Sequence, residues 1–148
     1  MQSPLGHFKT LPGANAHVES MQYAVFSCSN YGWGLFNAYE AAASLEDDLD
    51  FVMHLGDYYY EYPASIYPSR REAVRWEGLK PQHETMTLQD YRERHALYRR
   101  DAGLQQLTAK TALIAIWDDH EVSDNQYTGG AHHHHESQDG SFKERRGT

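Results

Sequence analysis

The sequence predicts an α/β fold in which parallel strands, separated by helices, carry polar side chains at their carboxyl ends. Three short apolar runs with the length and residue types of buried strands cover residues 21–27, 51–55 and 112–117. Segments rich in helix-forming residues separate these runs. The order strand, helix, strand favours a parallel pair joined by a right-handed crossover.

Composition limits the function classes. A chain of 148 residues with 40% hydrophobic residues suits one folded domain. A net charge of −8 argues against a nucleic-acid-binding surface and fits a protein that gathers carboxylates around cations. No apolar run approaches the ~18 residues of a membrane span, and no signal peptide is evident at Met1. The single cysteine, Cys28, excludes an internal disulfide and indicates no compartment.

The first half of the chain supports this order of elements. Residues 1–20 are rich in proline and glycine and resemble a linker. The first strand, 21–27, leads into a glycine-containing loop at 31–34. Residues 36–45 are then expected to form a helix that buries Phe36, Tyr39 and Ala43. An acidic turn at 46–50 precedes the second strand.

The second half begins with residues 63–86, which predict a long irregular excursion. Thr87 stands at the N-cap of a helix, with Asp90 three residues later as in a capping box. Leu88, Tyr91, His95 and Tyr98 form an apolar and aromatic stripe on that helix, and His95 is expected to pack or cap rather than bind metal. A short helix at 104–110 leads to the third strand.

The strand ends are candidates for one site. The three apolar runs end in Cys28, in Asp57 and in Asp118-Asp119-His120. The carboxyl ends of parallel strands share one edge of the sheet, so these side chains are expected to converge. Thiolate, carboxylate and imidazole together can bind a transition metal, and a carboxylate shared by two cations is typical of two-metal sites. The alternative for Asp57 alone is a turn cap.

Several segments, in order, resemble the PhoD-type alkaline phosphatase/phosphodiesterase family. The resemblance spans about residues 21–142 and is carried by Phe26-Ser27-Cys28-Ser29-Asn30, Phe36-Asn37-Ala38-Tyr39, the run Asp50 to Tyr62, Tyr91 to Tyr98, and Trp117-Asp118-Asp119-His120-Glu121-Val122. It implies a metallophosphoesterase-like layered α/β sandwich with an Fe(3+) and Ca(2+) centre. It also implies hydrolysis of phosphate mono- and diesters outside the cytoplasm.

The resemblance also implies roles, position by position. Cys28 resembles the thiolate ligand of iron, Asp57 the bridging carboxylate and Tyr60 the iron-bound phenolate. Asp119 would bind the second metal, and His120 would contact the phosphoryl group and assist catalysis. The neighbouring Tyr58 and Tyr59 are expected to pack, and Asn125 is interpreted as a loop residue rather than an extra ligand.

Departures from the family pattern qualify this expectation. Family catalytic domains are longer and contribute further aspartate and histidine ligands. Residues 1–20 resemble the end of a preceding β-sandwich domain, and residues 21–148 the N-terminal portion of a truncated catalytic domain. These residues alone are therefore expected to fold and catalyse poorly. The tract His132–His135 could bind metal; it is interpreted as a loop insertion, because engineered tags stand at a terminus and are longer.

Three function classes remain open. The first is a phosphate-ester hydrolase that uses a metal-activated water. The second is a catalytically inactive fragment that only binds metal or phosphate. The third, a cysteine hydrolase using Cys28, lacks any local nucleophile signature and is disfavoured.

Overall fold

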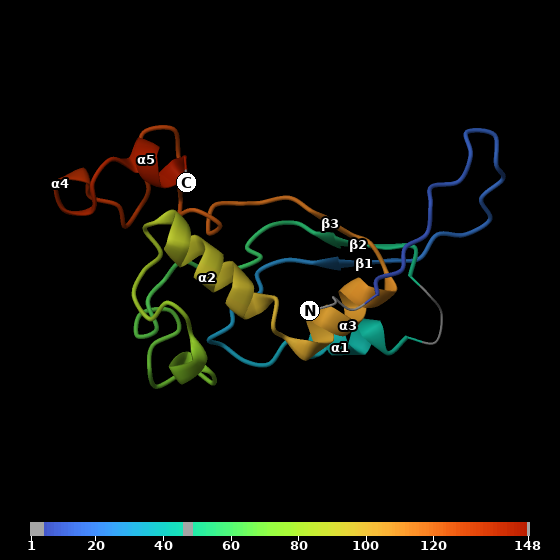
Figure 1. The fold of residues 1–148 in the computed structure, drawn as a ribbon, viewed down its shortest axis with the longest axis horizontal. Coiled ribbons are helices and arrows are strands. Elements are labelled where there is room, and N and C mark those ends of the chain that lie inside the picture. The colour runs from blue at the N-terminus through green and yellow to red at the C-terminus, as the bar shows by residue number, and fades with distance from the viewer. Residues whose placement is uncertain (1–4, 46–48, 148) are drawn as a thin grey trace.

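Three parallel strands organise the chain, as the sequence predicts. The computed structural model describes residues 5–45 and 49–147. The strands are β1 (Tyr23–Phe26), β2 (Phe51–His54) and β3 (Leu113–Ala115), in the order β1-β2-β3. All pairs are parallel, and Phe26, His54 and Ala115 lie side by side in register (Figure 1). The three carboxyl ends therefore stop at the same level of the sheet.

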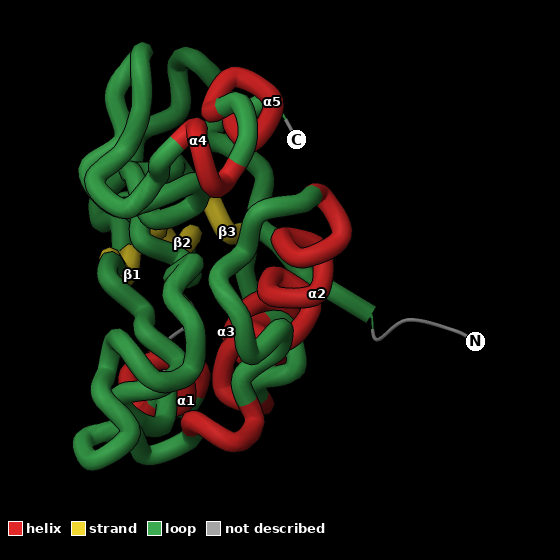
Figure 2. The backbone as a smooth tube through the Cα atoms, turned by 90° about the vertical axis from the view of Figure 1, so that its left-hand side faces the viewer, coloured by secondary structure: helices red, strands yellow, loops and turns green. Residues whose placement is uncertain are grey.

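The helices follow the predicted order with shifted ends. They are α1 (Asn37–Ala43), α2 (Leu88–Tyr98), α3 (Ala102–Lys110), α4 (Glu136–Asp139) and α5 (Phe142–Arg146), with a single 3₁₀ turn, η1, at Trp76–Gly78. The sequence interpretation missed α4 and α5, because four or five residues are too few to show a helical pattern. Figure 2 shows how much of the chain between the elements is loop.

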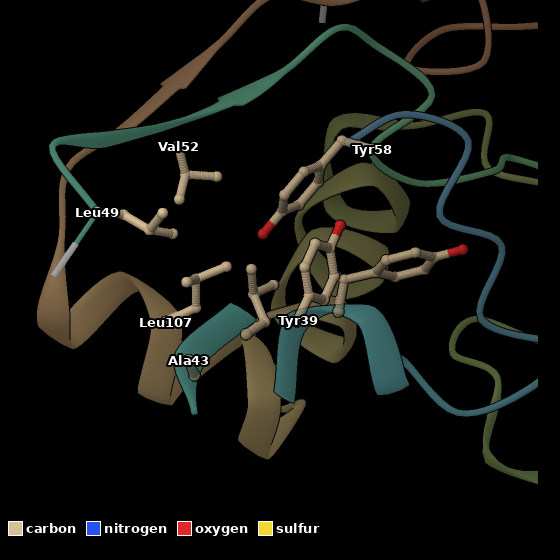
Figure 3. Close-up of a cluster of buried hydrophobic side chains, with 8 residues drawn as sticks. Tyr39, Ala43, Leu49, Val52, Tyr58 and Leu107 are labelled. Atoms are coloured by element: carbon tan, nitrogen blue, oxygen red, sulfur yellow. The ribbon is translucent and has the colours of Figure 1, made fainter. Parts of the chain in front are cut away.

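The core lies between the sheet and the pair of helices α1 and α3. Tyr39 and Ala43 from α1 face Leu107 from α3 and Val52 from β2, as Figure 3 shows. The burial of Tyr39 and Ala43 confirms the face predicted for this helix. The helices approach closely at Gly103, where an added Cβ would lie 2.9 Å from the backbone nitrogen of Glu40.

The opposite face of the sheet is bare in the described part of the chain. Val25, Met53 and Ile114 are aligned in register and share this face. The prediction of a buried third strand is wrong here, because Ile116 and Trp117, just beyond β3, are 63% and 73% exposed. The physical reason is that α1 and α3 cover only one face.

Helix α2 has the predicted start but a different buried face. Thr87 caps it, with the reciprocal hydrogen bonds of a capping box to Asp90. Tyr91 and Tyr98 are buried as expected, whereas Leu88 and His95 are exposed. His95 nevertheless packs its ring on Tyr58, at 5.8 Å between centroids.

A charged residue, Arg94, completes the buried face of α2. Its side chain is 1% exposed and donates hydrogen bonds to backbone carbonyls on both ends of the irregular excursion. Nε donates to Lys80 O at 2.9 Å, Nη2 to Pro81 O at 2.8 Å and His83 O at 3.3 Å, and Nη1 to Tyr62 O at 3.1 Å and to Tyr60 O. The sequence pattern of α2 did not indicate that Arg94 is buried, because its acceptors lie in distant parts of the chain.

The ends of the described chain attach by polar contacts. Residues 5–22 contain no helix or strand, and His7 N donates to Ala109 O at 2.8 Å. At the other end, Arg145 of α5 donates through Nε to Tyr91 Oη at 2.8 Å. Residues 46–48 of the predicted acidic turn and residues 1–4 of the predicted linker lie outside the described residues. Among the described helices, none combines the length and apolar character needed to cross a bilayer.

Candidate metal centre

The loops after β1 and β2 run together at the edge of the sheet. Cys28 N donates to Gly56 O at 3.2 Å, and Ser29 N donates to Asp57 O at 2.8 Å. Both Cys28 and Asp57 have positive φ angles, 57° and 51°. Non-glycine residues adopt this left-handed region only when their surroundings impose it, often at functional sites.

Gly56 allows the loop after β3 to join this pair. Its φ is +107°, and an added Cβ would lie 2.6 Å from Asp118 Cβ. Any side chain at this position would therefore push away the loop that carries Asp119 and His120. The three predicted strand ends converge because of the register of the sheet and because of this glycine.

The carboxylate of Asp57 lies at the centre of the cluster. Its Oδ2 accepts hydrogen bonds from Cys28 Sγ at 3.4 Å and from Tyr60 Oη at 3.2 Å. Its Oδ1 is buried and has no hydrogen-bond partner among the described residues. Burial raises the pKa of Asp57, and this effect outweighs the opposing influence of His120 and Cys28.

The donor atoms around Asp57 fit a cation. Burial, and then the nearby Asp57 and Cys28, raise the pKa of Tyr60, so the phenol keeps its proton in this environment. Two protonated groups, a thiol and a phenol, thus point at one carboxylate oxygen while the other oxygen is unpaired. A highly charged cation that replaces both protons would satisfy all of these atoms, because it lowers the pKa of the groups it binds.

Asp119 and His120 approach the same carboxylate from the loop after β3. One ligand atom from each of Asp57, Asp119 and His120 can be chosen so that all lie within 4.8 Å of one another. Asp119 is oriented by its own segment, with His120 N donating to Oδ1 at 2.9 Å and Asn125 N to Oδ2 at 2.5 Å. Asn125 itself has a φ of 52° and contacts Asp119 through its backbone, which fits a loop residue.

Glu61 supports the imidazole and was missed by sequence reasoning. Its side chain is fully buried, and Oε2 lies 2.8 Å from His120 Nδ1. Its other oxygen, Oε1, accepts from Asp124 N at 2.5 Å. Burial lowers the pKa of His120, but the hydrogen bond and charge of Glu61 outweigh this and leave the pKa raised. The available signal was a lone carboxylate inside the tyrosine run 58–62.

A second glutamate ties the loops together. The carboxylate of Glu121 accepts hydrogen bonds from Asp118 N at 2.8 Å and from Tyr58 N. The loops after β2 and β3 are thus joined just beside the candidate ligands. Tyr58 is buried and Tyr59 is half-buried, as expected for packing residues.

A cleft opens on the Cys28 side of the cluster. It has a volume of about 470 Å³ and is lined by Cys28, Asn30 and aromatic side chains that include Trp33, Tyr60 and Tyr67. The structure therefore places four of the predicted site residues, Cys28, Tyr60, Asp119 and His120, around the fifth, Asp57. Cys28 and Tyr60 also line the cleft.

Comparison with known proteins agrees with the sequence resemblance. The profile of the PhoD-like phosphatase family matches residues 23–148. Alkaline phosphatase D of Bacillus subtilis (strain 168) is 46% identical over 123 residues, which cover 83% of this chain and 20% of that protein. A solved structure described as "Structure of PhoD" superimposes with a TM-score of 0.84 at 41% identity, over 97% of this chain and 26% of the other. The chain thus spans about a fifth to a quarter of these relatives' length, and it belongs to the PhoD-like phosphatase family.

Proposed function

We propose that this chain provides part of a metal centre that hydrolyses phosphate esters with a metal-activated water. In this proposal Cys28, Asp57 and Tyr60 would hold Fe(3+), and Asp119 together with Asp57 would hold Ca(2+). The observation that carries the proposal is the pairing at Asp57, where two protonated donors meet Oδ2 at 3.4 and 3.2 Å while Oδ1 is buried and unpaired.

The donor types support this choice of metals. A trivalent iron can hold thiolate and phenolate as anions, and Ca(2+) prefers carboxylate oxygens. When bound, the cations would activate water and neutralise charge on the phosphoryl oxygens. Calcium usually takes six to eight oxygen ligands, so the few donors in this cluster call for further ligands from outside the described residues.

His120 is the residue proposed to act on the substrate. Glu61 fixes its ring through Nδ1 at 2.8 Å, so Nε2, which lies 3.9 Å from Asp124 Oδ1, is the ring atom proposed to meet the substrate. Hydrolysis adds the hydroxyl of water to phosphorus and a proton to the departing alkoxide oxygen. In its protonated form, which Glu61 favours, His120 would donate a hydrogen bond from Nε2 to that oxygen or to a phosphoryl oxygen, and so stabilise the charge that develops there.

The substrate class and setting follow from the family. The relatives are named as phosphatases, which supports phosphate esters as substrates. The proposal includes both mono- and diesters. Residues 21–148 are proposed to be the N-terminal portion of the catalytic domain, and residues 1–20 a linker from a preceding β-sandwich domain. We place the activity outside the cytoplasm, in the periplasm or in secreted form.

A binding module without catalysis is the second candidate. It is favoured by one observation, namely that the chain spans 20% of the curated relative and so offers only part of that protein's length for ligands. In this case the chain would retain metal or phosphate but would not turn over an ester.

Two amide substitutions test the proposal. Asp57→Asn and Asp119→Asn, in the full product of the reading frame that contains this chain, should each abolish hydrolysis of bis-nitrophenyl phosphate and reduce metal content. The physical reason is that an amide lacks the charge that holds the cations. The matched control is Asp139→Asn, an exposed carboxylate on α4.

Metal analysis and circular dichroism accompany the assay. Substantial turnover with full metal content in either variant would show that these carboxylates are only turn caps. Metal bound to the wild type without any turnover would favour the binding module.

A further inference from the structure

A second group of potential metal ligands lies next to the Cys28 cluster, where Asp124 Oδ1 is 3.9 Å from His120 Nε2. Asp124 Oδ2 is 3.2 Å from His132 Nδ1 and 3.8 Å from His133 Nε2. One ligand atom from each of the three residues can be chosen within 4.8 Å of the others. We propose that Asp124, His132 and His133 form a separate site for a divalent transition metal such as Zn(2+), which the hydrolytic centre does not require.

The backbone brings these residues together before any ion binds. Asn125 turns the chain with a φ of 52°. Tyr127 and Gly130 then pair across the loop, with Tyr127 N donating to Gly130 O at 2.8 Å. The loop closes where His132 N donates to Asp124 O at 2.9 Å. Because the hydrogen bonds of the turn already hold these residues in place, metal binding costs little further conformational entropy.

The spacing of the ligand atoms suits a small tetrahedral ion. With metal–ligand bonds of 2.0–2.1 Å, two ligand atoms on such an ion lie roughly 3.4 Å apart. The separations from Asp124 Oδ2, 3.2 and 3.8 Å, fall on either side of this value.

The chemistry of the donors selects the metal. Two imidazole nitrogens and one carboxylate oxygen suit Zn(2+), Cu(2+) or Ni(2+) rather than Ca(2+) or Mg(2+), which prefer all-oxygen sites. His132 and His133 are 64% and 47% exposed at the side chain, so an ion can enter and water can complete its coordination. The backbone of Asp124 is held in place by a hydrogen bond from its N to Glu61 Oε1.

The four histidines of the tract 132–135 differ in burial and in contacts, as expected for a folded site and not for a flexible chelating tail. His134 is buried, with Nε2 3.0 Å from Gly140 O. His135 is exposed at the start of α4 and lies outside the cluster. Only the first two histidines of the tract therefore face Asp124.

Calorimetric titration with Zn(2+) tests the proposal in the full chain. The titration uses an Asp57→Asn background, which removes one ligand of the Cys28 cluster and makes the result independent of hydrolysis. We expect one Zn(2+) per chain, with Asp124→Asn and His132→Ala each weakening binding at least about tenfold, because each removes an atom that would contact the metal. The control His135→Ala, in the same tract, should change affinity less than about twofold, because it touches neither Asp124 nor the other two ligands.

Two further measurements decide between a built site and the tract itself. Calcium at the same concentration should neither bind here nor compete with zinc. Unfolding the chain in urea should abolish the Asp124-dependent binding. The proposal is overturned if His135→Ala weakens binding as much as His132→Ala, if Asp124→Asn has no effect, or if no Zn(2+) binds.

Discussion

Replacing Arg94 should test how the fold holds the loop that carries Tyr60. The guanidinium is 1% exposed and donates five hydrogen bonds to backbone carbonyls, two of them on Tyr60 and Tyr62. Arg94→Met keeps the length of the stem but leaves these carbonyls without a charged donor. Hydrogen bonds to charged groups contribute about 1.5–3 kcal/mol each, and the cost of burying the charge offsets several kcal/mol of their sum.

We therefore expect Arg94→Met to lower the free energy of unfolding by about 3–5 kcal/mol. Arg94→Lys retains the charge but not the fork of donors, and should cost roughly half as much. Urea unfolding, followed by circular dichroism in dilute solution, measures both effects. With a slope of about 2 kcal/mol per molar urea, Arg94→Met should move the midpoint down by about 2 M.

The matched control is Arg92→Met, an exposed arginine on the same helix. It should change the free energy of unfolding by less than about 0.5 kcal/mol. The reasoning is refuted if Arg94→Met and Arg92→Met unfold at the same urea concentration. If Arg94→Met does not fold at all, Arg94→Lys still separates the two cases.

Three further predictions concern a ligand, a buried base and a close contact. On the proposed function, iron-loaded protein should be coloured by charge transfer from Tyr60, and Tyr60→Phe should remove that visible band; an unchanged spectrum would exclude Tyr60 as a ligand. Burial lowers the pKa of His54 to about 4, so its neutral form stabilises the fold above pH 6.5. About 3 kcal/mol should be lost as the pH falls from 6.5 towards 4, and His54→Gln should flatten this slope in pH-dependent urea unfolding. Gly103→Ala, which places a Cβ 2.9 Å from Glu40 N, should destabilise the chain by about 1–3 kcal/mol, whereas Gly34→Ala, where nothing lies within 4 Å of the added Cβ, should be near neutral.

The surroundings of His54 explain why its pKa is lowered. Its Nε2 lies 3.1 Å from Ser29 Oγ, which in turn is 2.5 Å from Tyr39 Oη, and its ring packs edge-on against Tyr58. Its Nδ1 is buried without a partner among the described residues. No carboxylate contributes to its shift, so desolvation of the charged ring alone sets the direction.

The sequence predicted the fold best where a local pattern of residue types is typical of a single structural element. Runs such as Phe51–His54 predicted parallel strands, and the capping box at Thr87 fixed the start of α2. Tyr60 was indicated only by the family resemblance. Cys28, Asp57, Asp119 and His120 were grouped because strand ends in a parallel sheet share an edge, and the register of Phe26 with His54 and Ala115 makes that edge level. These inferences need only local patterns and the topology of the sheet.

The burial of Arg94 and Glu61 and the contact between Asp124 and His132 were not predicted, because they depend on contacts that form only in the folded chain. Arg94 and Glu61 are charged residues that are normally exposed, and only the folded loop shows the carbonyls and the imidazole that permit their burial. Asp124 and His132 are eight residues apart, and their contact depends on a turn with a positive φ that the sequence does not specify. Burial of polar groups is a property of the assembled structure, so local patterns could not show it.

The bare face of the sheet leads to the last prediction, which concerns the solubility of the chain. Val25 and Ile114 are exposed on that face, and beyond β3 the side chains of Ile116 and Trp117 are also exposed. Each is apolar, and the outer edge of β3 has no strand paired to it among the described residues. Exposed apolar patches beside an unpaired strand edge promote association of chains.

We therefore expect the 148 residues alone to associate in a concentration-dependent way, to retain metal weakly and to hydrolyse bis-nitrophenyl phosphate poorly. Ile116→Lys should raise the soluble monomer fraction in sedimentation without lowering the urea midpoint, because the side chain already faces solvent and a charge opposes edge pairing. Val52→Lys is the matched control on the covered face, and it should unfold the chain, because Val52 is 1% exposed within the core. A wild-type chain that stays monomeric, melts cooperatively and turns over the ester would show that the bare face carries no such cost and that the centre is complete within these residues.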